Sequence, residues 1–535
     1  MNDSRLNWVR RTGLRALLVA PLLFVGQSCT DLTEVPQDAL TAKNAFKSDA
    51  EVLAGVASIY AGLRSTEWVG YITLNELTTD AMIVPTRGND WYDNGRWLEI
   101  HRQTWTASSG SALDDMNGAW NNLFSGVAKA NLLIDVVTKA GGANAPRNLA
   151  ELRTLRAWYY YMLLDMFGNV PIVTGTELMQ YPSATRSEVF AFVTKELQES
   201  RTALPEKWDA AGYGRVTKGV ADAILASLYL NAGVFSKTTG VSGTSYNSCN
   251  IPIGGSTGCQ LAIDAADRVI NSGTYTLNPN WKKNFSADNE TSPENIFVIV
   301  RVSDQALGGN NPMRTLHYTQ LNTGWGNPWN GFATLAETYN AFDPADERRG
   351  MWLAGQAYSF ETGAPVNDRT GAPLIFTTNI PDANAATEGT GVRFNKFVPI
   401  PNAPYGDGQP NDFPLFRLAE MYLIKGEAQN ELGNTAGALT ELNRIHSRHF
   451  TPPQMLAVTG QQAMRDAILK ERLLEFTAEG KRRTDLVRHG HFLDRWSTAM
   501  LNGKTDKRSE PYRILFPIPA TQISSNPKLT QNPGY

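Results

Sequence analysis

Apolar side chains recur at three- and four-residue spacing over much of the chain, which is the pattern of helices with one buried face. In one such segment the periodic positions are Leu53, Val56, Ala57, Tyr60 and Leu63. The same spacing predicts seven further helices, at 120–137, 152–167, 185–203, 218–230, 261–270, 419–432 and 436–448. These periods predict an all-α, mainly helical fold.

Two pairs of these helices resemble tetratricopeptide hairpins. In the pair at 419–448, Tyr422, Gly426, Ala438 and Leu442 occupy the offsets at which that repeat places an aromatic, two small residues and a large apolar one. The segment 218–270 is long enough for a second hairpin with an inserted loop. We therefore expect tetratricopeptide-like hairpins to form a helical scaffold.

The stretch 275–415 follows a different pattern. It is rich in Gly, Asn and Pro and holds short β-like runs, such as IFVIVRV at 296–302. We expect a loop-rich, partly irregular region laid over the helical scaffold, and loops of this kind often carry binding sites.

The first 28 residues have the layout of a secretory signal peptide. Four arginines, the last of them Arg15, flank or precede the ten apolar residues 16–25, a run too short for the roughly 20 residues of a membrane span. Ser28-Cys29 then resembles a bacterial lipobox, in which Cys29 would receive the lipid anchor, although Gly26 stands where Leu or Val is usual. The alternative is ordinary signal cleavage and a fully secreted protein.

The other two cysteines, Cys249 and Cys259, lie in one loop rich in Gly, Ser, Thr and Asn. In a chain with an export signal, this placement predicts a disulfide, because exported proteins meet an oxidising compartment. A catalytic cysteine is the weaker interpretation, since neither residue has a histidine near it in sequence.

Charge and motifs exclude several classes of function. Lys and Arg number 49 and Asp and Glu 52, a net charge of −3 without the basic footprint of a nucleic-acid-binding protein. The chain contains no GxGxxG, GxxxxGK[ST], HExxH or GxSxG motif. No cofactor is therefore predicted.

Two groups of polar residues could suggest a site but favour a structural interpretation. His446 and His449 could share a metal, yet no acidic or cysteine partner accompanies them in sequence, so we expect polar residues on a helix surface. Glu471, Glu475 and Glu479 are spaced as one helical face, and a glycosidase could use two such carboxylates as acid and base. Carboxylates on one face do not flank a substrate, so ion pairing between helices is favoured.

Aromatic residues give a stronger functional lead. The chain has 13 Trp, 18 Tyr and 21 Phe, and several of them cluster with Asn, Asp and Arg in two segments without helical period. Flat rings beside amides and carboxylates suit a sugar, whose C–H faces stack on rings while its hydroxyls form hydrogen bonds. Alternatively, these rings fill the core beneath the loops. The two segments span 87–105 and 317–329.

Several motifs in fixed order resemble the SusD/RagB family of outer-membrane nutrient-binding lipoproteins. The most specific are FPLFRLAEMYLIKGEAQNELG from Phe413, LNRI at 442–445 and ERLLEFTAEGKRRTDLVRHG at 471–490. Others are CTDL at 29–32, PSATRSEVF at 182–190, SPENIF at 292–297, AFD at 341–343 before Arg348-Arg349, FPIP at 516–519, and NP at 526 leading to the final QNPGY. Together these motifs cover nearly all of the chain after the signal peptide.

The resemblance implies a SusD-like fold and a binding function without catalysis. Residues 1–28 would be the signal peptide, 29–45 a lipidated tether and 46–535 one SusD-like unit. Within that unit the expected parts are an N-terminal helical part at 46–274, a loop-rich ligand-binding part at 275–415 and a C-terminal helical part at 416–535.

The resemblance also implies a location, a partner and a ligand. Such proteins are lipid-anchored to the outer membrane, face the cell exterior and pair with a SusC-like, TonB-dependent β-barrel transporter. They bind glycans or, in some members, peptides. The residues that it places at a sugar are Arg87, Asn89, Trp91 and Trp97 in the early loop and Tyr318, Trp325 and Trp329 in the mid-chain loop. A secreted glycan-degrading enzyme on a helical scaffold is the alternative from another class.

Overall fold

The apolar periods of the sequence become helices that pack against one another along the chain. A computed structural model describes residues 48–535 except 109, 238–240, 305–306, 322–326, 402–407, 495–499, 502–503 and 506–509. The predicted signal peptide, Cys29 and the tether lie outside the described residues. The helices are α1 (Asp49–Thr66), α2 (Thr73–Glu76), α3 (Arg96–His101), α4 (Leu113–Ala140), α5 (Ala145–Met166), α6 (Arg186–Ser200), α7 (Lys218–Leu230), α8 (Ala232–Phe235), α9 (Gly258–Ile270), α10 (Asn311–Thr315), α11 (Ala336–Ala341), α12 (Leu418–Glu431), α13 (Thr435–His446), α14 (Gln461–Phe476), α15 (Arg482–His489) and α16 (Ala520–Ser525).

All eight predicted helices are present, with small differences at their ends. The predicted helix at 120–137 starts earlier, because α4 begins at Leu113. Helix α5 ends at Met166, just before Gly168, whose φ of 70° is the left-handed conformation common after a helix. Thr185 caps α6 through a reciprocal pair with Glu188. The prediction of a mainly helical fold is confirmed.

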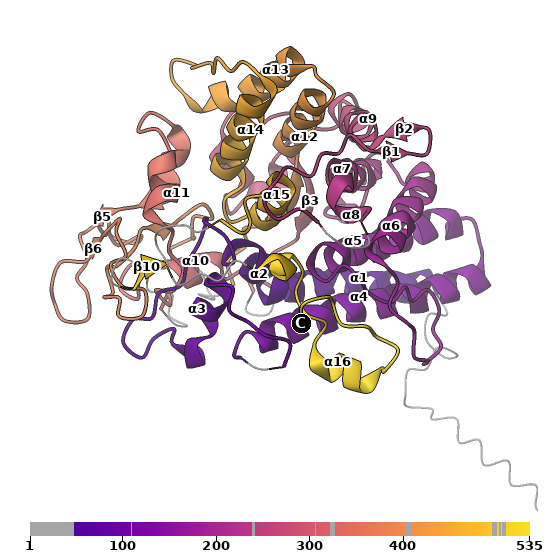
Figure 1. Cartoon of the computed structure of the whole chain (residues 1–535), viewed down its shortest axis with the longest axis horizontal. Helices are drawn as coiled ribbons and strands as arrows, with labels where there is room; N and C mark the ends of the chain where they lie inside the picture. Colours follow the sequence, from indigo (N-terminus) through magenta and orange to yellow (C-terminus); the bar gives the residue numbers. More distant parts are fainter. Residues whose placement is uncertain are drawn as a thin grey trace, which may run out of the picture. The chain divides into compact units, whose positions relative to one another are not determined.

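Helices that are neighbours in the sequence are mostly neighbours in space. Helix α4 packs on α1 and α5, α5 on α6, and α7 on α9, while α12 packs on α9, α13 and α14 (Figure 1). Gly126 lets α4 approach α5 closely, since a Cβ there would lie 2.3 Å from the ring of Tyr159. Gly426 likewise lets α12 approach α13 closely, since a Cβ there would lie 3.3 Å from the backbone oxygen of Ala438. The tetratricopeptide assignment of these pairs remains a prediction.

Strands are short and pair only two by two within the described residues. The longest pair joins β3 (Asn295–Ile299) and β8 (Phe413–Arg417) in antiparallel register. The IFVIVRV run thus forms a strand that ends sooner than the run itself. The remaining strands are β1 (Pro252–Ile253), β2 (Ser256–Thr257), β4 (Trp352–Leu353), β5 (Gly355–Gln356), β6 (Ile375–Phe376), β7 (Arg393–Phe394), β9 (Met500–Leu501) and β10 (Lys504–Thr505). Much of the described part of 275–415 is therefore loop.

Short helical turns lie in the segments that connect the helices and strands. Glu67–Ile72 (η1) is a π-type turn that prolongs α1 and is broken at Gly70, where φ is 115°. The 3-10 turns are η2 (Asp93–Gly95), η3 (Arg201–Ala203), η4 (Ala210–Gly212), η5 (Trp281–Asn284), η6 (Asn289–Thr291), η7 (Glu347–Met351), η8 (Ser447–His449) and η9 (Pro511–Ile514).

Cys249 and Cys259 are joined by a disulfide that ends at the start of α9. Their Cα atoms lie 4.8 Å apart, and the backbone N–H of Cys259 also donates to the carbonyl of Cys249 at 3.0 Å. Both side chains are buried. The loop is therefore closed by a covalent bond and a hydrogen bond at the same point.

A large buried ion network lies where the loop-rich part meets the C-terminal helices. Glu475 at its centre accepts hydrogen bonds from Arg417 at 3.0 Å, Arg448 at 2.7 Å, Arg348 at 3.0 Å and His449 at 2.9 Å. Burial alone would raise the pKa of Glu475, but the surrounding guanidinium groups and the hydrogen bond from His449 outweigh it and hold the pKa well below its usual range. The favoured interpretation of this acidic segment, ion pairing, is confirmed.

One detail of that interpretation is wrong, and so is the surface position expected for His446 and His449. Helix α14 ends at Phe476, so Glu479 leaves the helix and binds Arg417 and Lys396 from the following turn. His446 and His449 do not lie on the surface: both are buried, and they contact Glu471 and Glu475 at 2.8 and 2.9 Å. Sequence spacing missed these contacts because the carboxylate partners come from a different helix.

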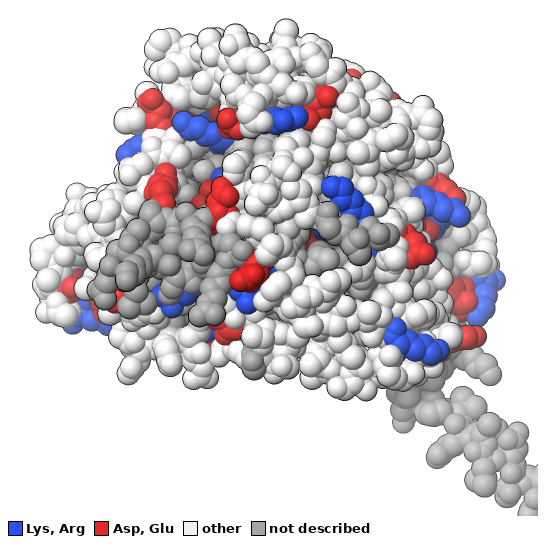
Figure 2. Space-filling model, viewed as in Figure 1, with Lys and Arg blue, Asp and Glu red and all other residues white. Residues whose placement is uncertain are grey.

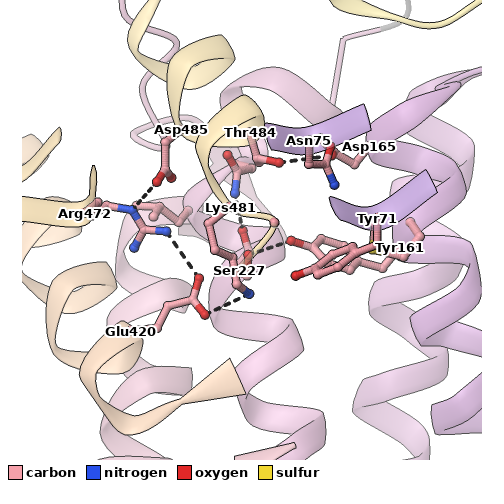
Figure 3. A pocket seen from close by; sticks show the side chains of 14 residues that line it. Tyr71, Asn75, Tyr161, Asp165, Ser227, Glu420, Arg472, Lys481, Thr484 and Asp485 are labelled. Atoms are coloured by element: carbon pink, nitrogen blue, oxygen red, sulfur yellow. Dashed lines mark hydrogen bonds and ion pairs between the residues drawn. The ribbon is translucent and has the colours of Figure 1, made fainter. Parts of the chain in front are cut away.

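A small polar cavity of about 10 Å³ lies where seven helical elements converge: η1, α2, α5, α7, α12, α14 and α15 (Figure 3). Arg472 of α14 donates to Asp485 of α15 at 2.8 Å and to Glu420 of α12 at 3.2 Å, and Glu420 lies 2.9 Å from Lys481. On the opposite wall, Tyr161 of α5 contacts Ser227 of α7. A cavity of this size holds about one water molecule, so it is a buried junction between early and late segments of the chain.

Candidate ligand-binding site

The two aromatic loops singled out in the sequence lie against each other in the structure. Trp91 of the early loop donates its indole N–H to the backbone carbonyl of Trp329 at 2.6 Å. Tyr318 of the mid-chain loop donates its hydroxyl to Asp90 Oδ2 at 2.7 Å. Two segments more than 220 residues apart in sequence are thus joined by hydrogen bonds. We take this junction as the candidate site.

The early loop turns tightly and presents its aromatic residues by an uncommon backbone conformation. Arg87 and Asp90 exchange backbone hydrogen bonds at 2.9 Å, and the chain then passes through Trp91, Asp93 and Asn94, all with positive φ. For Trp91, φ is 61°, which is rare for a bulky side chain and persists only where the surroundings hold it. The loop ends where α3 begins, at Arg96.

An aromatic cluster supports the site from below. The ring of Trp91 lies 5.2 Å from Trp97 and 5.7 Å from Phe332 between ring centroids, in edge-to-face geometry, and Phe332 meets Trp68 at 5.1 Å. Gly331 provides the room, because a Cβ at this position would lie 2.3 Å from the Trp91 ring. The cluster therefore fixes the position and orientation of the Trp91 indole.

Arg314 holds the indole of Trp329 in place. Its guanidinium lies over the ring of Trp68 at 4.2 Å and over that of Trp329 at 5.3 Å. Burial lowers the pKa of Arg314 to about 10, which leaves it charged at neutral pH. Trp329 itself is half-buried, so part of its ring remains open.

A chain of polar side chains runs beside the rings. Arg369 contacts Glu388 and donates to Asp90 at 2.7 Å while its guanidinium lies 4.5 Å from the ring centre of Tyr318. Glu388 in turn lies 2.9 Å from His317 Nε2. This chain joins the loop that carries Arg369 to both aromatic loops.

Both carboxylates of the polar chain stay ionised at neutral pH. The hydrogen bond from Tyr318 lowers the pKa of Asp90 further than burial raises it. Burial would raise the pKa of Glu388, but the hydrogen bonds from Arg369 and His317 reverse the shift and lower it. A glycosidase needs one carboxyl with a raised pKa as general acid, so these two groups suit binding rather than acid catalysis.

The predicted contact residues divide into exposed and supporting groups. Asn89 is exposed, whereas Trp91, Tyr318 and Trp329 are half-buried at the surface of the junction. Trp325 lies outside the described residues. Arg87 and Trp97 are 3% and 5% exposed and face inward, so they support the site in this conformation rather than face solvent.

The inward residues have clear structural roles. Arg87 donates to the backbone carbonyls of Gly331 and Thr390, both at 2.9 Å, which ties the early loop to two later segments. Burial lowers the pKa of Arg87 to about 10. The indole N–H of Trp97 donates to Asp93 at 2.6 Å. Sequence spacing could not separate such supports from surface rings, because both occur in the same segment.

Several residues of the site were missed by sequence reasoning. Arg369 and Glu388 belong to segments without aromatic clusters, and no local pattern marks them, while Arg314 lies three residues before the predicted mid-chain loop. Phe332 lies three residues beyond the predicted mid-chain loop, so extending that loop to the next aromatic residue would have found it. Tyr92, next to Trp91, is 55% exposed and adds an outward-facing ring that the prediction passed over.

On the face drawn in Figure 2, acidic and basic side chains are interspersed among uncharged residues, without a broad patch of either sign. In the part of the chain that the structure describes, no group of three or more His, Cys, Asp or Glu side chains could hold a metal ion. No described helix is long and apolar enough to cross a membrane.

Known proteins of similar sequence match nearly the whole chain. The starch-binding protein SusD of Bacteroides thetaiotaomicron is 26% identical over 506 residues, covering 86% of this chain and 84% of that protein. The SusD-like protein P25 of Formosa agariphila is 23% identical over 561 residues, covering 96% and 98%.

Solved structures share the fold. A laminarin-binding SusD-like protein superimposes with a TM-score of 0.71 at 21% identity, covering 92% of this chain and all of that one. Surface glycan-binding protein A of Bacteroides thetaiotaomicron, solved with laminarihexaose, gives a TM-score of 0.69 at 21% identity, covering 90% of this chain and 99% of that one. The predicted SusD-like fold is confirmed.

Two family models divide the chain between them. Residues 40–230 match a model described as starch-binding and associating with the outer membrane. Residues 234–535, more than half of the chain, match the model of the SusD family. The chain belongs to the SusD family.

Proposed function

We propose that this protein captures oligosaccharides at the cell surface and that the junction of its two aromatic loops is the binding site. The support comes from two directions. Relatives of the chain are named for starch, laminarin and glycan binding. Independently, the junction combines half-buried indole and phenol rings with fixed carboxylate and guanidinium groups, which is the chemistry that a sugar needs.

The site would bind by stacking first and hydrogen bonding second. The open parts of Trp329 and Trp91, with the exposed ring of Tyr92, offer apolar surface to the C–H faces of a sugar. Asn89 offers an amide that donates and accepts beside them. Arg87 and Trp97 would act through the loops they hold, without touching the sugar.

The remaining features follow from the family and from the sequence. We propose that residues 1–28 direct export, that Cys29 carries a lipid and that 29–45 tether the protein to the outer membrane, facing the cell exterior. The chain would then pass its ligand to a SusC-like, TonB-dependent transporter. The division of 46–535 into helical parts at 46–274 and 416–535 around a ligand-binding part at 275–415 belongs to the same proposal. The proposed outer-membrane location is supported by a family model that is named for association with the outer membrane.

One observation carries the proposal: loops predicted from sequence to hold sugar are bonded to each other through Trp91 and Trp329. This bond uses the backbone of Trp329, so replacing its side chain removes only the ring. Trp329→Ala should therefore abolish retardation of the protein in native gels containing laminarin or starch while the fold stays intact. Trp329→Phe, which keeps an aromatic face, is the matched control and should retain much of the retardation.

The same incubation separates the other functions that the sequence left open. A binding protein should release no new reducing ends from either polysaccharide, whereas turnover would show a glycan-degrading enzyme. A peptide-binding member should show no retardation by polysaccharide and should be indifferent to Trp329→Ala. Either result would overturn the proposal.

A further inference from the structure

A second pocket lies between the α6–α7 connection and the segment that leads into β3. Its volume is about 500 Å³, within the range of sites that enclose small organic ligands. Three aromatic residues line it, Trp208, Tyr213 and Tyr275, together with Thr217, Thr291 and Asn295. None of these residues belongs to the loop junction described above. Figure 1 draws α6, α7 and α9 on the opposite side of the view from α3 and α10.

The aromatic walls of this pocket are held in place by their own polar atoms. Tyr213 donates its hydroxyl to the buried Asp412 at 2.6 Å, and the hydroxyl of Tyr275 lies 3.1 Å from Thr217 Oγ1. Trp208 donates its indole N–H to the carbonyl of Val216 at 2.9 Å. Because their hydroxyl groups are already engaged, the rings of Tyr213 and Tyr275 offer a ligand their apolar surfaces in fixed orientations, while the indole of Trp208 is covered by Arg215 and Arg147.

The pocket lining carries charged residues of both signs: Glu206, Lys207, Asp209, Arg215 and Glu290. Two of them, Glu206 and Arg215, are held in ion pairs. Arg215 lies over the ring of Trp208 at 3.7 Å and makes two hydrogen bonds to Glu151, at 2.9 and 2.6 Å. Glu206 is paired with Lys218 at 2.8 Å. A strongly charged ligand would therefore meet no uncompensated cluster of the opposite sign.

Polar groups without charge complete the lining. Thr217 and Thr291 contribute hydroxyl groups. Asn295 donates to the carbonyl of Asn284 at 3.2 Å, while its buried Oδ1 atom has no hydrogen-bond partner in the described part of the protein. The lining therefore combines hydroxyl and amide groups with the aromatic rings.

We infer that this pocket is a second carbohydrate site, which takes a short neutral oligosaccharide. Fixed aromatic faces, hydroxyl and amide groups, and nearly balanced charge are the combination that a neutral polyhydroxylated ligand requires. The inference rests on the proposed function, since it assumes that the protein meets glycans. It adds a second place on the same chain where a glycan is held, so one long polysaccharide could engage both.

Blocking substitutions test the pocket without dismantling it. Thr291 is exposed at the rim, and Thr291→Trp would place an indole across the opening while leaving the aromatic walls unchanged. Thr276→Trp is the matched control, because Thr276 is exposed nearby and does not line the pocket. Far-ultraviolet circular dichroism would verify that both variants fold. Trp329→Ala serves as the variant of the first site.

Isothermal titration of the full chain with laminarihexaose and with maltohexaose gives the readout. The inference predicts two binding events per chain for at least one of these sugars, one lost in Thr291→Trp and the other lost in Trp329→Ala, with Thr276→Trp unchanged. If Thr291→Trp binds as the wild type does, the second site is refuted and the proposed function stands. If Trp329→Ala binds as the wild type does while Thr291→Trp loses binding, the loop junction is refuted and the pocket stands. Absence of binding to both sugars by the wild type would count against both.

Discussion

Replacing the central carboxylate of the buried ion network should destabilise the protein far more than replacing a surface carboxylate. Glu475 is fully buried, and its two oxygens accept four hydrogen bonds, from Arg348, Arg417, Arg448 and His449. In Glu475→Gln the shape is kept, but an amide nitrogen now faces two of these donors. The change therefore removes two hydrogen bonds to charged partners and the charge that three guanidinium groups share.

The magnitude follows from those contacts. Two hydrogen bonds to charged groups, at about 1.5–3 kcal/mol each, give a loss of about 3–6 kcal/mol. Breaking a buried ion pair by removing one partner costs about 3–5 kcal/mol, in agreement. With an unfolding entropy of roughly 2.1 cal/mol/K per residue over residues 46–535, each kcal/mol lowers the melting temperature by about 1 °C. We expect a decrease of about 3–6 °C.

The assay is urea and thermal unfolding of the variant beside a matched control. Glu206→Gln makes the same chemical change in a carboxylate that is 62% exposed and paired with Lys218. Exposed pairs contribute about 0–1 kcal/mol, so this control should unfold almost as the wild type does. If the two variants lose equal stability, the network does not hold the loop-rich part to the C-terminal helices, and the reasoning is refuted.

Three further predictions follow from other parts of the fold. Replacing Cys249 and Cys259 together by Ser should cost about 3 kcal/mol of unfolding free energy by loop-closure entropy, measured in urea without reductant; an unchanged midpoint would contradict it. Arg348 and His446 outweigh the opposing effect of burial and lower the pKa of Glu471 to about 2. Ionised Glu471 therefore stabilises the folded state fully above the usual glutamate pKa, and this stabilisation should be lost as pH falls from about 4.3 to 2. The urea midpoint should fall over that range in the wild type and fall less in Glu471→Gln. Gly331→Val should push Trp91 out of place and weaken retardation in laminarin or starch gels, at a stability cost of about 1–3 kcal/mol; unchanged retardation would show that the Trp91 ring is not part of the site.

How far the sequence predicts the fold depends on the range of the interactions. The helices from α4 to α7 follow from local periodicity, since their apolar faces and caps, such as Thr185 with Glu188, lie within a few turns. The surface position expected for His449 was wrong because its partner, Glu475, comes from another helix, and burial of a histidine depends on such partners. Periodicity also extended the acidic helix past Phe476, where Ala478 and Gly480 adopt positive φ.

The candidate site shows the same division. Clustering of Trp91 and Trp329 with polar residues could be read from sequence, and the structure brings the two loops together. The inward turn of Arg87 toward the carbonyls of Gly331 and Thr390 could not be predicted from sequence, because those carbonyls lie 244 and 303 residues away. Arg369 was missed for the same reason: its role arises only where three distant loops meet.

The most direct test of the account is to locate a bound sugar along the chain by amide hydrogen–deuterium exchange. The wild-type protein would be labelled with and without saturating laminarihexaose or maltohexaose, and protection would be compared for each peptide. The account predicts slower exchange in residues 87–97 and 327–332, where Trp91 and Trp329 meet, and loss of that protection in Trp329→Ala. Binding of the sugar without protection of either segment would contradict the claim that the two aromatic loops form the site.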